Sequence, residues 1–143
     1  MIKIICVGKL KEKYNRDACQ EYTKRISKYT KIEIIELKDS NILEERDNIL
    51  KYINKDYIIT LDIDGNSLDS PTLSKKIDNI FLTNSNITFI IGGSYGLHED
   101  IKKLSNFSLS FSKLTFPHQL FRVMLLEQIY RSFKIINNET YHK

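Results

Sequence analysis

The chain of 143 residues fits one domain, residues 1–143, and is long enough to bury a single substantial core. Its composition, with 41% hydrophobic and 28% charged residues, is that of an ordinary globular protein and disfavours extended disorder or collagen. The net charge of +4 comes entirely from residues 71–143, since residues 1–70 hold 13 basic and 13 acidic residues. This mild bias fits a solvated surface as well as a nucleic-acid-binding surface.

Short apolar runs predict five strands, and helical patterns lie between them. The strands are expected at Ile2–Val7, Ile32–Leu37, Tyr57–Leu61, Ile87–Ile91 and Phe107–Phe111. Apolar residues at three- and four-residue steps predict a helix from Tyr14 to Tyr29 and a weaker one from Leu43 to Ile53. Ser70 is expected to cap a third helix, with Pro71 in its first turn, and Pro117 to open a fourth that runs to about Asn137. This alternation predicts an α/β fold, with a mostly parallel sheet and helices on both faces.

Several features of the sequence restrict the cellular location and the metal sites that we expect. The longest apolar runs are of strand length and the opening MIKIICVGKLKEKY resembles a strand more than a signal peptide, so we expect a cytoplasmic protein without a membrane span. Cys6 and Cys19 lack a CxxC pattern or a histidine at ligand spacing, which predicts packing residues and no metal site. The segment Asp62-Ile63-Asp64-Gly65 lacks the terminal Glu of a calcium loop and is typical of a turn.

In open α/β sheets ligands bind beyond the carboxyl ends of the strands, so the segments that follow the strands are the candidate site. The first, Gly8-Lys9-Leu10-Lys11, has neither a GxGxxG nor a GxxxxGK[ST] pattern, which disfavours NAD and P-loop chemistry. Residues 92–96 hold three glycines, so their backbone can approach a ligand closely and offer N–H groups to it, although a tight connection without a ligand would look similar.

The segment Phe111–His118 mixes polar and apolar residues, which could sandwich an aromatic ring or simply seal the core. His118, in the first turn of the last helix, is a candidate proton acceptor, although a single histidine is more often structural. Arg122 is four residues later and lies on the same helix face. The terminal Tyr141-His142-Lys143 would be frayed by default, yet its side chains suit contact with an RNA base and a phosphate.

Taken together and in this order, these segments resemble the RlmH family of bacterial ribosomal RNA methyltransferases, within the SPOUT superfamily. The residues that carry the resemblance are IKIICVGKLKEKY, Thr60-Leu61-Asp62 with Gly65, Ile91–Leu97, Leu109–His118, Arg122-Val123, Glu127–Arg131 and Tyr141-His142-Lys143. They cover essentially the whole chain. One departure is the connection Asp39–Asp47, which is short for the family.

The resemblance implies a SPOUT-type fold whose C-terminal part forms a deep trefoil knot, an exception to the rule that chains avoid knots. It implies methyl transfer from S-adenosylmethionine to N3 of a pseudouridine in 23S ribosomal RNA, by a homodimer that acts on the assembled ribosome. The cofactor is expected to contact Leu61, Gly92, Phe111, Ser112, Lys113, Leu114, Thr115 and Phe116.

The roles of the remaining site residues are hypotheses. His118 or His142 is expected to assist removal of the N3 proton, and Arg122 to stabilise charge or hold a phosphate. Arg122, Tyr141, His142 and Lys143 are expected to contact RNA. The alternatives are a SPOUT methyltransferase that acts on tRNA, a non-enzymatic ribosome-binding module, and a protein that binds phosphorylated metabolites through residues 92–96.

Overall fold

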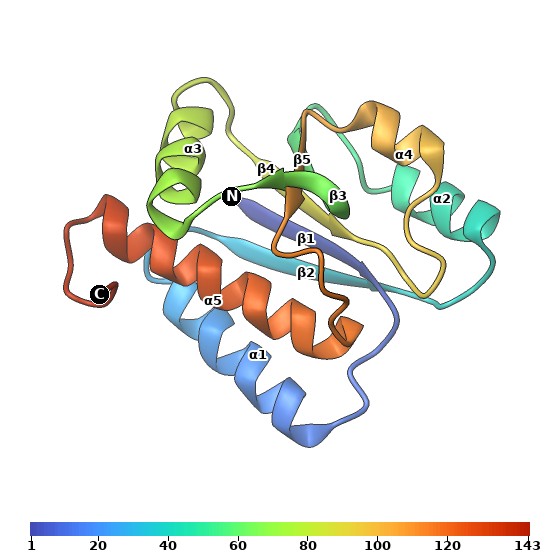
Figure 1. The fold of residues 1–143 in the computed structure, drawn as a ribbon, viewed down its shortest axis with the longest axis horizontal. Coiled ribbons are helices and arrows are strands. Elements are labelled where there is room, and N and C mark those ends of the chain that lie inside the picture. Colours follow the sequence, from blue (N-terminus) through green and yellow to red (C-terminus); the bar gives the residue numbers. More distant parts are fainter.

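The computed structural model describes all residues, 1–143, and its central feature is a parallel sheet with the strand order β2-β1-β4-β3-β5 (Figure 1). The strands are β1 (Ile2–Val7), β2 (Ile32–Leu37), β3 (Tyr57–Ser67), β4 (Ile87–Ile91) and β5 (Phe107–Ser110). The helices are α1 (Lys13–Ile26), α2 (Ile42–Leu50), α3 (Ser70–Thr83), α4 (Glu99–Leu104) and α5 (His118–Ile136). The predicted α/β architecture is confirmed. The knot that the resemblance implies stays a prediction.

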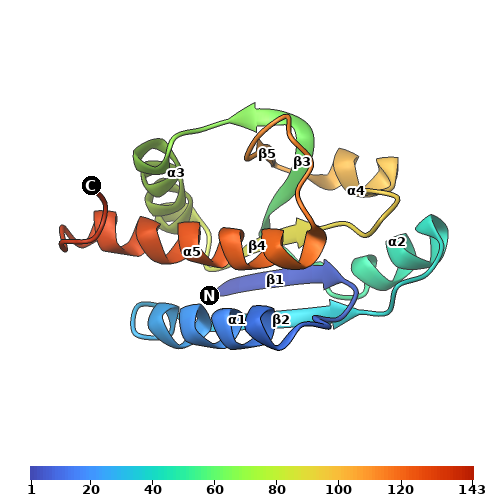
Figure 2. The same ribbon diagram turned by 60° about the horizontal axis from the view of Figure 1, so that its bottom comes forward.

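Helices cover both faces of the sheet, because alternate strand residues point to opposite sides. In β1, Ile2, Ile4 and Cys6 belong to the larger core, which also contains buried residues of α1, α3 and α5. Ile5 and Val7 belong to a smaller core with residues of α2 and α4. Figures 1 and 2 both show α1 and α5 side by side, and the rings of Tyr22 and Tyr130 approach to 6.2 Å between them.

Both cysteines are buried and free, as expected of packing residues. Burial raises the pKa of the Cys6 thiol to about 12, so this group stays protonated in the core. No helix combines the length and the apolar character that crossing a membrane requires.

Several sequence-based boundaries were wrong, and one helix was not predicted. Asp69, and not Ser70, caps α3, since its carboxylate accepts a hydrogen bond from the N–H of Thr72 at 2.8 Å, while Ser70 is already helical. The helix α4 at Glu99–Leu104 was not predicted; the imidazole Nδ1 of His98 caps it by accepting a hydrogen bond from the N–H of Asp100. The strand β3 runs to Ser67, beyond the expected end at Leu61.

Candidate active site

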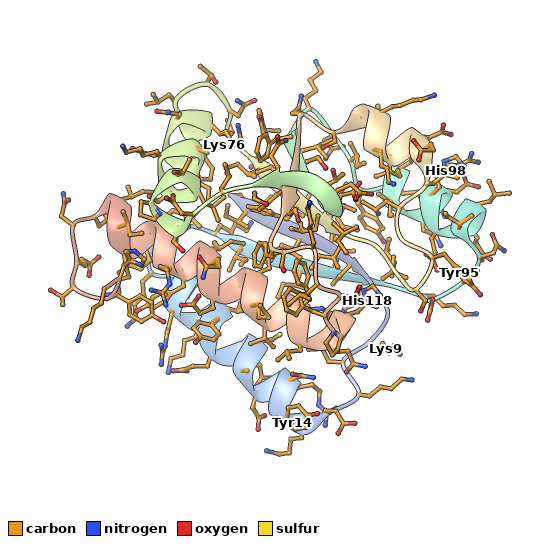
Figure 3. All side chains as sticks on the ribbon, in the orientation of Figure 1. Lys9, Tyr14, Lys76, Tyr95, His98 and His118 are labelled. Carbon is orange, nitrogen blue, oxygen red and sulfur yellow. The ribbon has the colours of Figure 1, made fainter.

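A cavity of about 410 Å³ opens at the carboxyl ends of β3, β4 and β5, where ligands of open α/β sheets bind. Figure 3 labels His118, Tyr95 and Lys9 along this edge of the molecule. Three segments and two single residues line the cavity. The segments are Leu61–Asp64, Ile91–Leu97 without Tyr95, and Leu109–His118 without Ser110, Lys113 and Pro117, and the single residues are Lys102 and Phe121. Its volume is in the range of small-molecule sites.

A bulge in β3 forms one wall of the cavity. Leu61 and Asn66 both align with Leu109 of β5, so residues 62–65 are looped out of the strand pairing. The N–H of Asp64 donates to the Asp62 carboxylate at 3.1 Å, which closes a tight turn within the bulge. A Cβ atom at Gly65 would lie 2.8 Å from the carbonyl oxygen of Ser108, so only glycine lets the two backbones approach this closely. The expected simple turn is therefore a bulge, after which β3 resumes.

The loop after β4 is folded tightly on itself. The N–H of Gly96 donates to the carbonyl of Gly93 at 3.0 Å, and Gly96 has a φ of +74°, which favours glycine. A Cβ atom at Gly92 would lie 2.6 Å from the Gly96 carbonyl oxygen. Three of the lining residues in this loop are glycines, so its backbone forms much of the second wall of the cavity.

The segment between β5 and α5 forms the third wall. The buried hydroxyl of Ser110 donates toward the carbonyls of Ile63, at 3.0 Å, and Ser112, at 3.2 Å, and so ties this segment to the bulge. Aromatic contacts hold the segment against α5, because the Phe121 ring packs on Phe111 at 4.8 Å between centroids and on Phe116 at 6.2 Å. The first and third walls of the cavity are thus joined by contacts within the chain itself.

The structure brings most of the residues expected to contact the cofactor together. Leu61, Gly92, Phe111, Ser112, Leu114, Thr115 and Phe116 all line the cavity. Lys113 is exposed and is not among the lining residues. His118 also lines the cavity, from the first turn of α5.

Arg122 lies apart from the cavity lining and is buried, with 4% of its surface exposed. Its guanidinium forms an ion pair with Glu36 at 2.5 Å and donates to the carbonyl of Gly8 at 2.9 Å. Its Nε is buried without a hydrogen-bond partner. Within the chain, this side chain therefore connects α5, β2 and the end of β1.

Tyr141 and His142 pack on α5 and are not frayed. The Tyr141 hydroxyl donates to the Glu127 carboxylate at 3.1 Å, and its ring contacts Tyr130 at 4.9 Å. Burial, followed by the charge of Glu127, raises the pKa of Tyr141 to about 12. The imidazole of His142 lies 3.0 Å from Arg131.

His142 lines a second cavity, of about 850 Å³, beside α3 and α5. Leu109 and Phe111 line both cavities, so the two lie on either side of β5 and its end. Tyr141 and Lys143 line neither cavity. Within one chain, the C-terminal residues therefore do not contribute to the cavity that His118 lines.

Three charged residues line the cavity without having been predicted to bind a ligand: Asp62 and Asp64, whose segment was interpreted as a turn, and Lys102. The amine of Lys102 lies 3.6 Å from the Asp62 carboxylate, so charges of both signs reach the cavity. The position of the Asp62–Asp64 segment directly after a buried strand was the available signal, but its residue pattern is equally typical of an ordinary turn. No group of three or more His, Cys, Asp or Glu side chains with metal-binding geometry is present.

An open parallel sheet with a cavity at its carboxyl edge defines the class of α/β proteins that bind ligands beyond their strand ends. Residues 1–142 match the family model described as predicted SPOUT methyltransferase. The chain therefore belongs to the SPOUT methyltransferase family.

Two relatives from Clostridium botulinum are both named ribosomal RNA large subunit methyltransferase H. The chain is 55% identical to that of strain Alaska E43 / Type E3 and 54% identical to that of strain Eklund 17B / Type B, over 99% of this chain and 99% of each relative. Both alignments have 157 positions, more than the 143 residues here, so this chain lacks residues that the relatives have.

Among solved structures, the chain is similar to a probable methylase family protein from Haemophilus influenzae Rd KW20. The TM-score is 0.60 at 10% identity, over 99% of this chain and 70% of that one. This likeness shows a shared fold.

Proposed function

We propose that this protein transfers a methyl group from S-adenosylmethionine to N3 of a pseudouridine in 23S ribosomal RNA of the assembled ribosome. The observation that carries the proposal is the cavity at the carboxyl ends of β3, β4 and β5, in a chain of the SPOUT methyltransferase family. The substrate class follows the names of relatives that are 54% and 55% identical over nearly their full length. The pseudouridine and its N3 follow from the sequence resemblance.

The apolar residues of the cavity fit the adenine ring of this cofactor. Phe111, Phe116 and Leu61 supply apolar walls, and the backbone groups of residues 92–96 and 111–116 can pair with the ring edges. Leu114 lines the cavity but is 72% exposed, so a ligand bound there would cover an apolar side chain that the chain alone leaves open.

The polar residues of the cavity fit the rest of the molecule. The carboxylates of Asp62 and Asp64 can accept hydrogen bonds from ribose hydroxyls or an ammonium group, and the Lys102 amine can pair with a carboxylate. When bound, S-adenosylmethionine supplies a methyl group that its sulfonium already activates.

The task of the protein is to align the reacting nitrogen and to remove its proton. The N3–H of pseudouridine is weakly acidic, so a base at the cavity accelerates the reaction. His118 lines the cavity and is exposed, and we assign it this role. A cation near the developing imide anion would stabilise it further.

His142, the other candidate for proton transfer, is assigned with Tyr141 and Lys143 to RNA contact. In a homodimer, which we include in the proposal together with a cytoplasmic location, the C-terminal residues of one protomer can reach the cavity of its partner. The support is that Tyr141 and His142 are held on α5 and that none of the three residues lines their own protomer's first cavity. Arg122, by contrast, supports the site from within, through Gly8.

Methyl transfer tests the proposal directly. Purified protein is incubated with labelled S-adenosylmethionine and either intact ribosomes, naked ribosomal RNA or tRNA, and the modified nucleoside is identified by mass spectrometry. We expect 3-methylpseudouridine only with ribosomes. Label in tRNA, or no transfer to any RNA in the presence of bound cofactor, would overturn the proposal.

A further inference from the structure

The loop that joins β1 to α1, residues 8–12, lies beside the start of α5. The backbone N–H of Lys11 donates to the Gln119 side chain at 2.7 Å, and the Gly8 carbonyl accepts from Arg122 at 2.9 Å. His118, the neighbour of Gln119, lines the active-site cavity. Figure 3 shows Lys9 and His118 at the same edge of the molecule. The β1–α1 loop therefore borders the cavity on the α5 side, although it contributes no residue to the lining.

Hydrogen bonds fix the conformation of this loop. Arg16 donates to the carbonyl of Leu10 at 3.2 Å and to that of Lys11 at 2.7 Å. The side chain of Leu10 packs against the larger core, whereas Lys9 and Lys11 on either side of it are exposed. The loop consequently presents two ammonium groups to solvent from a fixed backbone.

The charges of Lys9 and Lys11 are not paired with any carboxylate of the chain. Neither lysine forms an ion pair. By contrast, Lys13 forms an ion pair at 2.7 Å with Asp17, which lies one helical turn after it. Of the carboxylates nearby, Glu36 is paired with Arg122, and Glu12 is exposed within the loop itself. Unpaired lysines on a fixed backbone beside a cavity are suited to contact phosphate groups.

We infer that Lys9 and Lys11 bind backbone phosphates of the RNA next to the nucleotide that enters the cavity, and that they position the RNA without reading its sequence. The inference rests on the proposed function and adds a contact surface to it. Phosphate contacts of this kind set affinity and its salt dependence, whereas the chemical step depends on other groups. The two lysines should accordingly influence KM and leave kcat unchanged.

The test compares Lys9→Gln/Lys11→Gln with Lys9→Arg/Lys11→Arg, which keeps both charges. Lys24→Gln/Lys28→Gln serves as a matched control, because Lys24 in the last turn of α1 and Lys28 just after the helix are both exposed and form no ion pair. Initial rates of methyl transfer to ribosomes are measured over a salt series, binding to ribosomes is measured by sedimentation, and cofactor affinity by calorimetry.

We expect the KM of the Lys9→Gln/Lys11→Gln protein for ribosomes to rise about tenfold or more. The slope of log KM against the logarithm of the salt concentration should be smaller by about one to two. The kcat and cofactor affinity of this variant should match wild type, as should the behaviour of the arginine variant and of the α1 control. An unchanged KM and salt slope, or an equal loss in the α1 control, would overturn the inference. If wild-type protein binds ribosomes but transfers no methyl group, the proposed function fails, while the salt dependence of sedimentation still decides the role of the lysines.

Discussion

The guanidinium of Arg122 donates a hydrogen bond of 2.9 Å to the carbonyl oxygen of Gly8, across 114 residues of the sequence. This contact joins the first turns of α5 to the end of β1. Gly8 has a φ of +97°, so the chain turns sharply at the point that Arg122 holds. This buried side chain holds the start of the β1–α1 loop, and the hydrogen bond from the Lys11 N–H to Gln119 holds its end.

Replacing Arg122 should destabilise the protein. Arg122→Ala leaves Glu36 without its partner and the Gly8 carbonyl without its donor, so we expect a loss of about 2–3 kcal/mol in the free energy of unfolding. Glu36→Gln should cost less, because the Glu36 side chain is 38% exposed and its amide can still accept a hydrogen bond. Urea unfolding measures both. Equal stability of Arg122→Ala and wild type would contradict this role.

Gly92→Ala should impair cofactor binding, because a methyl group at this position would lie 2.6 Å from the Gly96 carbonyl oxygen and would force the loop after β4 apart. We expect the affinity for S-adenosylmethionine, measured by calorimetry, to fall about tenfold or more, which corresponds to about 1.4 kcal/mol.

Gly96→Ala is the matched control for this substitution. The added methyl group meets nothing within 4 Å there, and the variant carries only the strain of a positive φ, about 1–2 kcal/mol. It should lose stability without the steric effect on the cavity. A Gly92→Ala protein that binds the cofactor as wild type does would show that the tight turn is not needed for binding.

His118→Gln removes the proposed base but keeps a side chain that forms hydrogen bonds. We expect kcat for methyl transfer to fall about 100-fold or more, since general-base catalysis contributes factors of this order. Cofactor affinity should change little. A normal kcat in this variant would assign proton removal to another group, and His142→Gln tests the remaining candidate by the same assay.

The buried carboxyl group of Glu45 should make the free energy of unfolding of the protein depend on pH. The Glu45 side chain is 2% exposed, and burial raises the pKa of the carboxyl group above its ordinary value, against the hydrogen bond from the N–H of Ser40. The folded protein therefore holds this proton more tightly than the unfolded chain does. The stability that the protonated group contributes is present below the ordinary carboxyl pKa and is lost as pH rises through the raised value.

Glu45→Gln removes this titration while keeping the shape of the side chain. We expect thermal melts at a series of pH values to show that the variant gains stability relative to wild type as pH rises through this range, and that the difference is constant at higher pH. Parallel curves for the two proteins over the whole range would contradict the predicted protonation of Glu45.

Removal of Tyr141, His142 and Lys143 should affect catalysis far more than cofactor binding, because none of the three lines the first cavity. We expect methyl transfer to ribosomes to fall about tenfold or more if these residues supply RNA contacts of about 1.4 kcal/mol or more. Tyr141→Phe is the control for packing, since it loses only the hydrogen bond to Glu127 and about 1 kcal/mol of stability. Equal losses of cofactor affinity and transfer in the shortened protein would argue against an RNA-contacting role.

The sequence predicted β1 and β4 well because every residue of these two central strands is buried, so their apolar runs are nearly continuous. It failed where a single hydrogen bond sets a boundary, as at Asp69, whose carboxylate caps α3 although Ser70 is an equally good capping residue by type. The bulge in β3 was missed because its cause, the close approach of Gly65 to Ser108, joins segments that are remote in sequence.

The candidate site was predicted through its backbone segments more than through its charged residues. The segments around Gly92 and Phe111 follow buried strands, so their place at the carboxyl edge follows from the parallel sheet. The burial of Arg122 depends on Glu36 in another element, and Lys102 belongs to the helix that the sequence did not reveal. Periodicity along one segment carries no information about such contacts.

The central claim is that the cavity between Gly92 and Phe116 holds the methyl donor. A crystal structure of the protein grown with S-adenosylmethionine tests this claim most directly. We predict density for the donor against Leu61, Gly92 and the segment from Phe111 to Phe116, with the methyl group accessible from the side of His118. Density for the donor elsewhere, with this cavity empty, would contradict the account.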